Sequence, residues 1–153
     1  MSEETFEERK KRENKKFYEK WLSCGFKGKM EFDEHGWVKN GWNIQGKEKV
    51  VFDKGCLNRA SLFYTQLPNG KWISGSDVFC RVAGHCHGLS IWNKQHDTKE
   101  EAVEQALKDI ERIIHPKDKK SLMKLVEAVR NEFKQDTLFI PIATEQFEQV
   151  SLF

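Results

Sequence analysis

Apolar residues gather at the end of the first 24 residues, a segment that is otherwise strongly charged. They recur at three- and four-residue spacing, as on one face of a helix: Phe17, Tyr18, Trp21 and Leu22. Only the last two turns of such a helix can pack on a core. Gly25 and Gly28 follow, and glycine readily adopts the left-handed conformation that ends a helix. The pattern predicts a charged N-terminal helix over residues 1–24.

The next part of the chain contains short runs of aromatic and β-branched residues separated by Gly, Asn and Asp, a pattern typical of strands. The runs with this composition are 29–37, 41–46, 49–55, 61–67, 71–82 and 88–92. Asn69-Gly70 supplies the positive φ angles that a tight hairpin turn requires. We therefore expect 61–67 and 71–75 to be antiparallel neighbours.

Two amphipathic helices are predicted after the strands. Thr98 and Glu101 have the spacing of a capping box, in which each side chain accepts a hydrogen bond from the backbone of the other. The first apolar stripe consists of Ala102, Val103, Ala106, Leu107, Ile110, Ile113 and Ile114, and the helix should end at His115-Pro116. A second helix should begin near Pro116, with its apolar face made by Leu122, Leu125, Val126, Val129 and Phe133.

These elements predict an α+β fold: an antiparallel sheet of about four to six short strands, packed by the two later helices and preceded by the charged helix. We expect the α+β domain to occupy residues 25–133. Residues 134–153 lack a long apolar stripe and contain Pro141, so we expect an extended C-terminal tail there.

Length and composition are those of a single compact domain. The chain has 153 residues, of which 38% are hydrophobic and 33% charged. No run approaches the roughly 20 apolar residues that span a bilayer, and the first 16 residues are too charged for a secretory signal. The sequence therefore predicts a cytoplasmic protein with no membrane contact, in which Cys24, Cys56, Cys80 and Cys86 are reduced thiols.

The last five residues, Gln149-Val150-Ser151-Leu152-Phe153, resemble the peptide by which bacterial replication and repair proteins bind the DNA sliding clamp. That family motif is Gln, an aliphatic residue (mostly Leu), Ser or Asp, Leu and Phe, and only Val150 departs from its commonest form. The resemblance implies that Leu152 and Phe153 enter an apolar pocket of the clamp, while Gln149 binds a polar subsite. The competing interpretation is that Leu152 and Phe153 fold back into the core of their own domain.

A looser copy of the motif lies at Gln135-Asp136-Thr137-Leu138-Phe139. It keeps Gln, Leu and Phe at the same spacing, but Asp136 stands where an aliphatic residue belongs. The competing interpretation is a strand or turn that packs Leu138, Phe139 and Ile140 on the core.

Thiol and imidazole side chains cluster at Cys80, His85, Cys86 and His87, and Cys56 could join them. The spacing does not fit the usual zinc fingers, and a polar hairpin turn around Gly84 and Gly88 explains the same residues. Cys86 has the side-chain chemistry of a nucleophile, but its neighbours on a strand point to the opposite face. We therefore expect no catalytic residue, metal site or cofactor, and no enzyme activity.

A basic block in the N-terminal helix could neutralise phosphates: Arg9, Lys10, Lys11, Arg12, Lys15 and Lys16. The net charge of the chain is only +2, so any such effect must be local. The competing interpretation is a solvated helix held by Glu–Lys pairs four residues apart. Four tryptophans could stack on single-stranded bases or belong to the core: Trp37, Trp42, Trp72 and Trp92.

A fainter resemblance covers about a third of the chain. The hairpin "LPNGKWISGSDVFC", the strand "GLSIW" and the helix "DTKEEAVEQALKDIERI" are similar to a small hairpin-helix element of phage and plasmid DNA-modification proteins. The methylase and nuclease motifs are missing, so no catalytic residues carry over.

The sequence thus leaves two functional interpretations. The first is a bacterial or phage adaptor that binds the sliding clamp through residues 149–153. The alternative is a phage or mobile-element accessory or counter-defence protein that binds a host protein or DNA directly.

Overall fold

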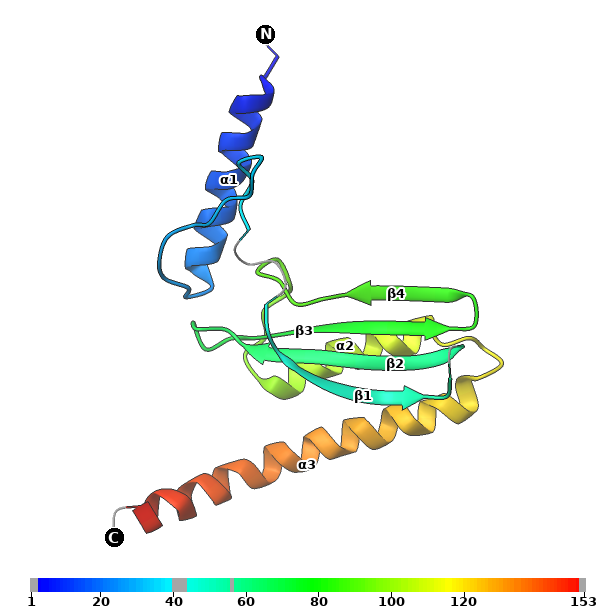
Figure 1. Cartoon of the computed structure of the whole chain (residues 1–153). Helices are drawn as coiled ribbons and strands as arrows, with labels where there is room; N and C mark the ends of the chain where they lie inside the picture. The colour runs from blue at the N-terminus through cyan, green and yellow to red at the C-terminus, as the bar shows by residue number, and fades with distance from the viewer. Residues whose placement is uncertain (1–2, 40–43, 56, 152–153) are drawn as a thin grey trace.

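The computed structural model describes residues 3–39, 44–55 and 57–151, with side chains described up to residue 135. The elements follow the chain order α1, β1, β2, β3, β4, α2, α3 (Figure 1). Within this part of the chain, four strands form one antiparallel sheet in the order β1-β2-β3-β4. The predicted α+β fold, with an N-terminal helix and two helices after the sheet, is confirmed.

Helix α1 (Phe6–Ser23) begins with a capping box. The Glu8 N–H donates to the Thr5 hydroxyl at 3.2 Å, and the Thr5 N–H donates to the Glu8 carboxylate at 3.1 Å. Phe17 and Trp21 are buried, so the last two turns of the helix pack on a core, as predicted, while its first half contacts the loop at residues 35–37. Gly25, with φ +93°, ends the helix.

The sheet consists of β1 (Lys47–Asp53), β2 (Asn58–Gln66), β3 (Trp72–Cys80) and β4 (Ala83–His87). Strands β2 and β3 are antiparallel, and the turn between them has Gly70 at φ +89°. The Leu67 N–H donates to the Lys71 carbonyl at 2.7 Å, which closes the hairpin. The hairpin predicted from Asn69-Gly70 is therefore confirmed, but the positive φ expected at both residues is found at Gly70 and not at Asn69.

The two edge strands differ in how well they are protected against pairing with a strand of another chain. Strand β1 carries four charged residues, has an irregular register between Val50 and Phe52, and is joined to α3 by an ion pair between Lys49 and Glu132 at 3.0 Å. Strand β4 has the sequence Ala-Gly-His-Cys-His and no Lys, Arg, Asp or Glu. Charges, bulges and covering helices are the usual means of blocking an edge, so β1 is blocked and β4 is bare.

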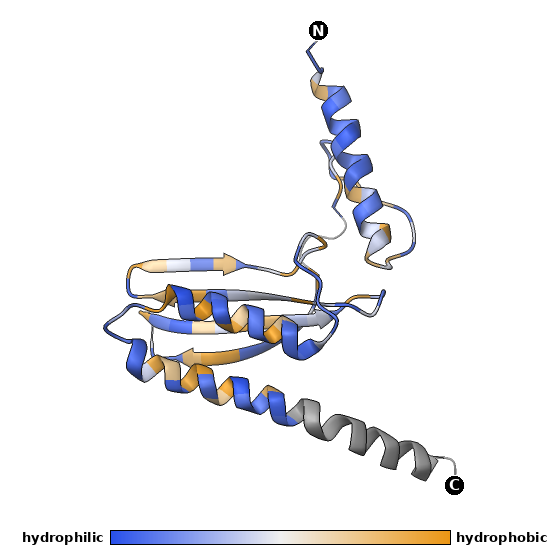
Figure 2. Cartoon of the chain, turned by 180° about the vertical axis from the view of Figure 1, so that it is seen from behind, coloured by the Kyte–Doolittle hydropathy of each residue, from blue (hydrophilic) through white to orange (hydrophobic). Residues whose placement is uncertain are grey.

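Helices α2 (Lys99–Ile113) and α3 (Lys119–Ser151) lie on one side of the sheet (Figure 2). Apolar residues of both helices pack with those of the strands in the main core. The main core includes Leu62 and Val78 from the strands, Leu107 and Ile110 from α2, and Val126 from α3. The apolar stripes predicted for both helices therefore provide the buried faces. Helix α2 has Thr98 as its N-cap, and the Glu101 N–H donates to its hydroxyl at 3.2 Å.

Arg130 connects α3 to α2 through a group of carboxylates. Its guanidinium donates to Glu104 at 2.7 Å and to Glu111 at 2.6 Å, both on α2, and it also bonds Glu127 on its own helix. These hydrogen bonds raise the pKa of Arg130 further above its ordinary value. The two helices are thus joined by charge as well as by apolar packing.

A second, smaller core lies between α1 and the nearby end of the sheet. It is made by residues from α1, the following loop, the β2–β3 hairpin and the segment after β4: Phe17, Trp21, Cys24, Val38, Leu67, Ile73, Leu89 and Ile91. Aromatic residues reinforce it, since Trp21 stacks on Phe26 with ring centroids 5.7 Å apart.

Two of the predicted strand runs are wrong. Segment 29–37 makes only an isolated bridge between Phe32 and Val38, and 88–92 is not a strand. The physical reason is that apolar residues of these segments pack in the second core instead of joining the ladder. At 88–92 the buried Asn93 side chain also donates to the Gly88 carbonyl at 3.0 Å, which favours a turn. In the run 41–46, residues 44–46 are not a strand, and 41–43 lie outside the described residues.

An extended tail is expected over residues 134–153, but the structure has helix α3 there as far as Ser151. Its Glu, Gln, Lys and Leu residues favour a helix there, whereas Pro141 and the β-branched Thr, Ile and Val residues oppose it. The helix begins at Lys119, three residues after the predicted start at Pro116. Over the described residues, no helix combines the length and the apolar character needed to cross a bilayer.

Candidate functional site

A tight turn from Asp33 to Trp37 packs against the first half of α1. The Asp33 carboxylate accepts hydrogen bonds from the backbone N–H groups of His35 and Trp37, each at 2.9 Å. These bonds, that from Trp37 foremost, lower the pKa of Asp33. The turn is fastened to α1 because Lys10 donates to the His35 carbonyl at 3.1 Å and Asn14 donates to the Gly36 carbonyl at 2.9 Å.

A cleft of about 670 Å³, here called the first cleft, lies along one flank of α1. Its walls are Phe6, Arg9, Glu13, Asn14, Phe17, Trp37, Val38 and Trp92. Edge-to-face ring contacts join residues of its walls: the Phe6 and Trp37 centroids are 6.0 Å apart, and those of Phe17 and Trp92 are 5.6 Å apart. The cleft is therefore mainly aromatic, with the polar groups supplied by α1.

A second cleft of about 460 Å³ also borders α1. It is lined by Asn14, Lys15, Tyr18, Lys29, Met30 and Phe32. Asn14 lines both clefts, and its side chain bonds to the Asp33–Trp37 turn. The two clefts thus adjoin, with one side chain of α1 common to both.

Exposed apolar side chains are concentrated around these clefts. Among the described residues, the large hydrophobic side chains that are exposed near α1 are Phe6 (63%), Tyr18 (38%), Leu22 (45%), Phe32 (52%) and Trp92 (43%). Val50, Leu57 and Val82 are exposed elsewhere. Four of the five around α1 are aromatic, which gives this region a composition typical of binding surfaces.

The basic block divides into paired and unpaired cations. Lys10 bonds Glu7 at 3.4 Å, and Arg12 bonds Glu4 at 2.9 Å and Glu13 at 3.5 Å. The other four make no side-chain hydrogen bond or ion pair with any described residue, and all are exposed: Arg9, Lys11, Lys15 and Lys16. We call the two clefts and these four cations the α1 surface.

The expected Glu–Lys pairs four residues apart are not found among the described residues of α1, so the spacing in that interpretation is corrected; the helix is exposed and has ion pairs at other spacings. Glu8, the partner expected for Arg12, accepts from Thr5 in the capping box. Glu7, the partner expected for Lys11, bonds Lys10 instead. The acidic residues upstream therefore leave much of the basic block unneutralised.

The tryptophans considered for stacking have different environments. Trp37 and Trp92 line the first cleft. Trp72 is half-buried at the start of β3, where its backbone pairs with that of His96. Trp42 lies outside the described residues. Only Trp37 and Trp92 are thus placed beside the basic helix.

The thiols and imidazoles of 80–87 do not converge. Cys80 is buried and faces the helices, whereas Cys86 is exposed and pairs with Asp77 on the other face of the sheet. His85 and His87 share a face, as predicted, with nearly parallel rings 6.0 Å apart. Over the described residues no group of three or more His, Cys, Asp or Glu could hold a metal ion, and Cys56 lies outside them.

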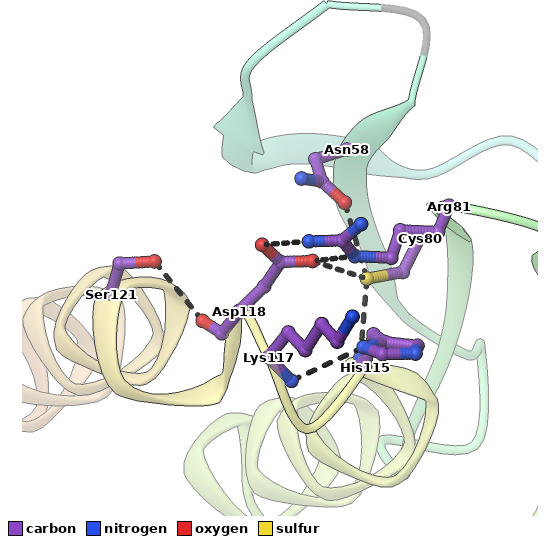
Figure 3. A network of polar contacts seen from close by, with 7 residues as sticks. All are labelled: Asn58, Cys80, Arg81, His115, Lys117, Asp118 and Ser121. Carbon is purple, nitrogen blue, oxygen red and sulfur yellow. Dashed lines mark hydrogen bonds and ion pairs between the residues drawn. The ribbon is translucent and has the colours of Figure 1, made fainter.

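A polar network that the sequence did not predict surrounds Cys80 (Figure 3). Arg81, in the β3–β4 turn, donates to the two oxygens of Asp118 at 2.7 and 3.2 Å, which lowers the pKa of Asp118. The Cys80 thiol donates to the Asn58 side-chain oxygen at 3.2 Å and accepts from the His115 N–H at 3.2 Å. The network joins the sheet to the α2–α3 turn, so we assign it a structural role.

The terminal peptide Gln149, Val150, Ser151, Leu152 and Phe153 falls where side chains are not described. The same holds for Asp136 to Phe139 in the looser copy. Both sequence hypotheses about clamp binding therefore stay predictions.

No family model, curated protein or solved structure matches this chain. The fold and the site define a small α+β protein with an aromatic and basic surface at its first helix.

Proposed function

We propose that the protein is a non-enzymatic, cytoplasmic adaptor with two binding elements. The folded domain holds a partner at the α1 surface, and residues 149–153 bind the bacterial DNA sliding clamp. The observation that carries the proposal for the folded domain is the gathering of exposed aromatic side chains around two clefts. Folding normally buries such side chains, and surface clusters of them mark sites that a partner covers.

The clamp element rests on the sequence. A peptide that docks by two apolar anchors gains about 1.5 to 3 kcal/mol for each anchor that it buries completely. Docking in an extended form requires residues 149–151 to leave the end of α3. Leu152 and Phe153 supply those anchors, and Ser151 keeps the middle of the motif small. Val150 is aliphatic but smaller than the usual Leu, which lowers the expected affinity without removing the motif.

The α1 surface also favours a second candidate function, in which a phage or mobile-element accessory protein binds a host protein or DNA directly. In that case the last five residues pack on their own domain and have no role in binding. The two functions differ in whether the purified clamp is bound.

The test is a titration of the full chain with purified bacterial clamp. The double variant Leu152→Ala/Phe153→Ala should weaken binding by roughly a hundredfold or more, because both anchors are lost. The matched control, Leu138→Ala/Phe139→Ala, removes the same residue types from the looser copy and should bind like the natural chain.

Two results would count against the clamp proposal. One is equal clamp affinity for the natural chain and for the terminal double variant. The other is a large fall in thermal stability of that variant, which would show that Leu152 and Phe153 belong to the core.

A further inference from the structure

We infer that the partner of the α1 surface is single-stranded nucleic acid, an inference that rests on the proposed role of this surface in binding but not on the clamp. Three features of the surface carry it: unpaired cations, exposed aromatic rings, and their arrangement on both flanks of one helix.

The positive charge of the chain is concentrated on α1, and part of it is free to bind phosphates. The helix contains seven basic and four acidic residues, so its formal charge of +3 exceeds the +2 of the whole chain. Four of the basic side chains have no described partner, so no internal ion pair must break when a phosphate arrives. Such cations attract phosphates through counterion release.

Aromatic rings stand beside these cations in both clefts. Arg9 lines the first cleft together with Trp37 and Trp92, and Lys15 lines the second together with Tyr18 and Phe32. A ring that receives a base and a cation that receives the adjoining phosphate are the two parts of a single-strand binding site. Each flank of α1 therefore provides one complete subsite.

The spacing along α1 suits a short stretch of strand. Arg9 and Lys16 are seven residues apart, which is about 10.5 Å along a helix axis, or roughly three nucleotides at 3.4 Å each. Stacking in the clefts requires bases whose faces are free, and a duplex hides those faces. The surface should therefore select single strands over duplex.

One acidic group lies in the first cleft. The Glu13 carboxylate is 3.5 Å from the Arg12 guanidinium, which also pairs with Glu4 at 2.9 Å, so Glu13 is only partly balanced and reduces the positive charge of this cleft. A second copy of the chain is a poor occupant, because two positively charged helices would repel each other. An acidic peptide would satisfy the cations but would leave the aromatic clefts without ring partners.

The experiment measures the fluorescence anisotropy of a labelled 20-nucleotide oligo(dT) titrated with the full chain from 50 to 200 mM salt. A duplex of equal length and unlabelled poly-glutamate serve as competitors. We expect saturable binding to the single strand, at least tenfold weaker competition by the duplex, and a log–log salt slope of about −3 for four phosphate contacts.

Two kinds of variant separate charge from stacking. Lys15→Gln/Lys16→Gln should reduce the salt slope by about 1.4, whereas Lys119→Gln/Lys120→Gln, an adjacent exposed pair at the start of α3, should leave it unchanged. Trp92→Ala should weaken binding by about tenfold to a hundredfold at constant slope. Phe6→Ala tests the same cleft at a more exposed ring, and Val82→Ala is the apolar control.

Several results would overturn the inference. They are no saturable binding, equal competition by duplex or poly-glutamate, unchanged affinity of both Phe6→Ala and Trp92→Ala in folded form, or a change of oligomeric state in place of DNA binding. Because clamp binding is titrated separately, loss of the DNA signal with clamp binding intact would refute this inference and leave the clamp proposal standing.

Discussion

At the scale of single residues, Arg81 shows how a side chain can hold an unfavourable backbone conformation. Its φ of +58° lies in the left-handed region, which non-glycine residues seldom adopt. The turn keeps this conformation because the guanidinium bonds both oxygens of Asp118, and the Arg81 N–H donates to the Leu57 carbonyl. Three loops that are distant in the sequence thus meet at one residue.

The Arg81–Asp118 pair predicts a pH-dependent stability. Because the pKa of Asp118 is lower in the folded protein than in the unfolded chain, its contribution is complete above the unfolded value of about 3.9 and is lost as the pH falls through the folded value. Asp118→Asn should therefore lower the melting temperature at pH 7, and the difference should shrink as the pH falls below about 3.9. Thermal melts across this range test the prediction, with the exposed Asp77→Asn as the control. A constant difference at every pH would contradict it.

At the scale of elements, the β2–β3 hairpin determines where α1 ends. The Asn69 N–H donates to the Cys24 carbonyl at 3.0 Å, and its side chain donates to the Ser23 carbonyl at 3.1 Å. Gly25 lies directly against this turn, where an added Cβ would be 2.5 Å from the Asn69 nitrogen. The hairpin therefore acts as the C-terminal cap of the helix.

Two glycines allow this contact to be measured. Gly25→Ala should destabilise the protein by about 3 kcal/mol or more, because it combines an unfavourable positive φ with a clash against backbone atoms. Gly70 also has a positive φ, but an added Cβ there has no atom within 4 Å. Gly70→Ala should thus cost only about 1 kcal/mol. Urea denaturation measures the free energy of unfolding of both variants. Equal losses of stability would show that the hairpin and the helix are not in close contact at Gly25.

The sequence pattern predicted the elements whose signals are local. The stripe of α2, the face from Leu122 to Phe133 and the Asn-Gly turn each need only neighbouring residues. The runs 29–37 and 88–92 look like strands because they must bury apolar residues, and composition does not distinguish burial in a ladder from burial against a helix. Helix α3 continues beyond Lys134 although Pro141 and several β-branched residues oppose it, so no local signal in the sequence marks this part of the helix.

The candidate site could be predicted only in parts. The cations of α1 and the tryptophans were recognised separately, but their meeting depends on the turn at Asp33, which fastens residues 35–37 to the helix. Which cations stay unpaired depends on the capping box, because it engages Glu8. The Arg81–Asp118 contact had no sequence signal, since the two residues are 37 positions apart.

At the scale of the whole molecule, two cores share the same strands. Strand β3 places Ile73 in the core beside α1 and Val78 in the core under α2 and α3. Strand β2 supplies Leu62 to the second of these, and Leu67, just after it, packs in the first. Neither core can therefore lose its packing without disturbing the sheet that supports the other.

This connection predicts cooperative unfolding. Trp21, Trp37 and Trp92 surround α1, so tryptophan fluorescence largely follows the smaller core, while far-UV circular dichroism is dominated by the helices as a whole. The two signals should give coincident urea transitions, as expected for a single two-state domain. A fluorescence midpoint at lower urea than the circular dichroism midpoint would show that the α1 region unfolds independently.

The unequal edges of the sheet limit how far any self-assembly through strands can proceed. If two copies join through β4, the outer strands of the enlarged sheet are both β1, whose charges, irregular register and contact with α3 oppose further pairing. Growth by edge addition would thus terminate at a pair and could not propagate into a fibre.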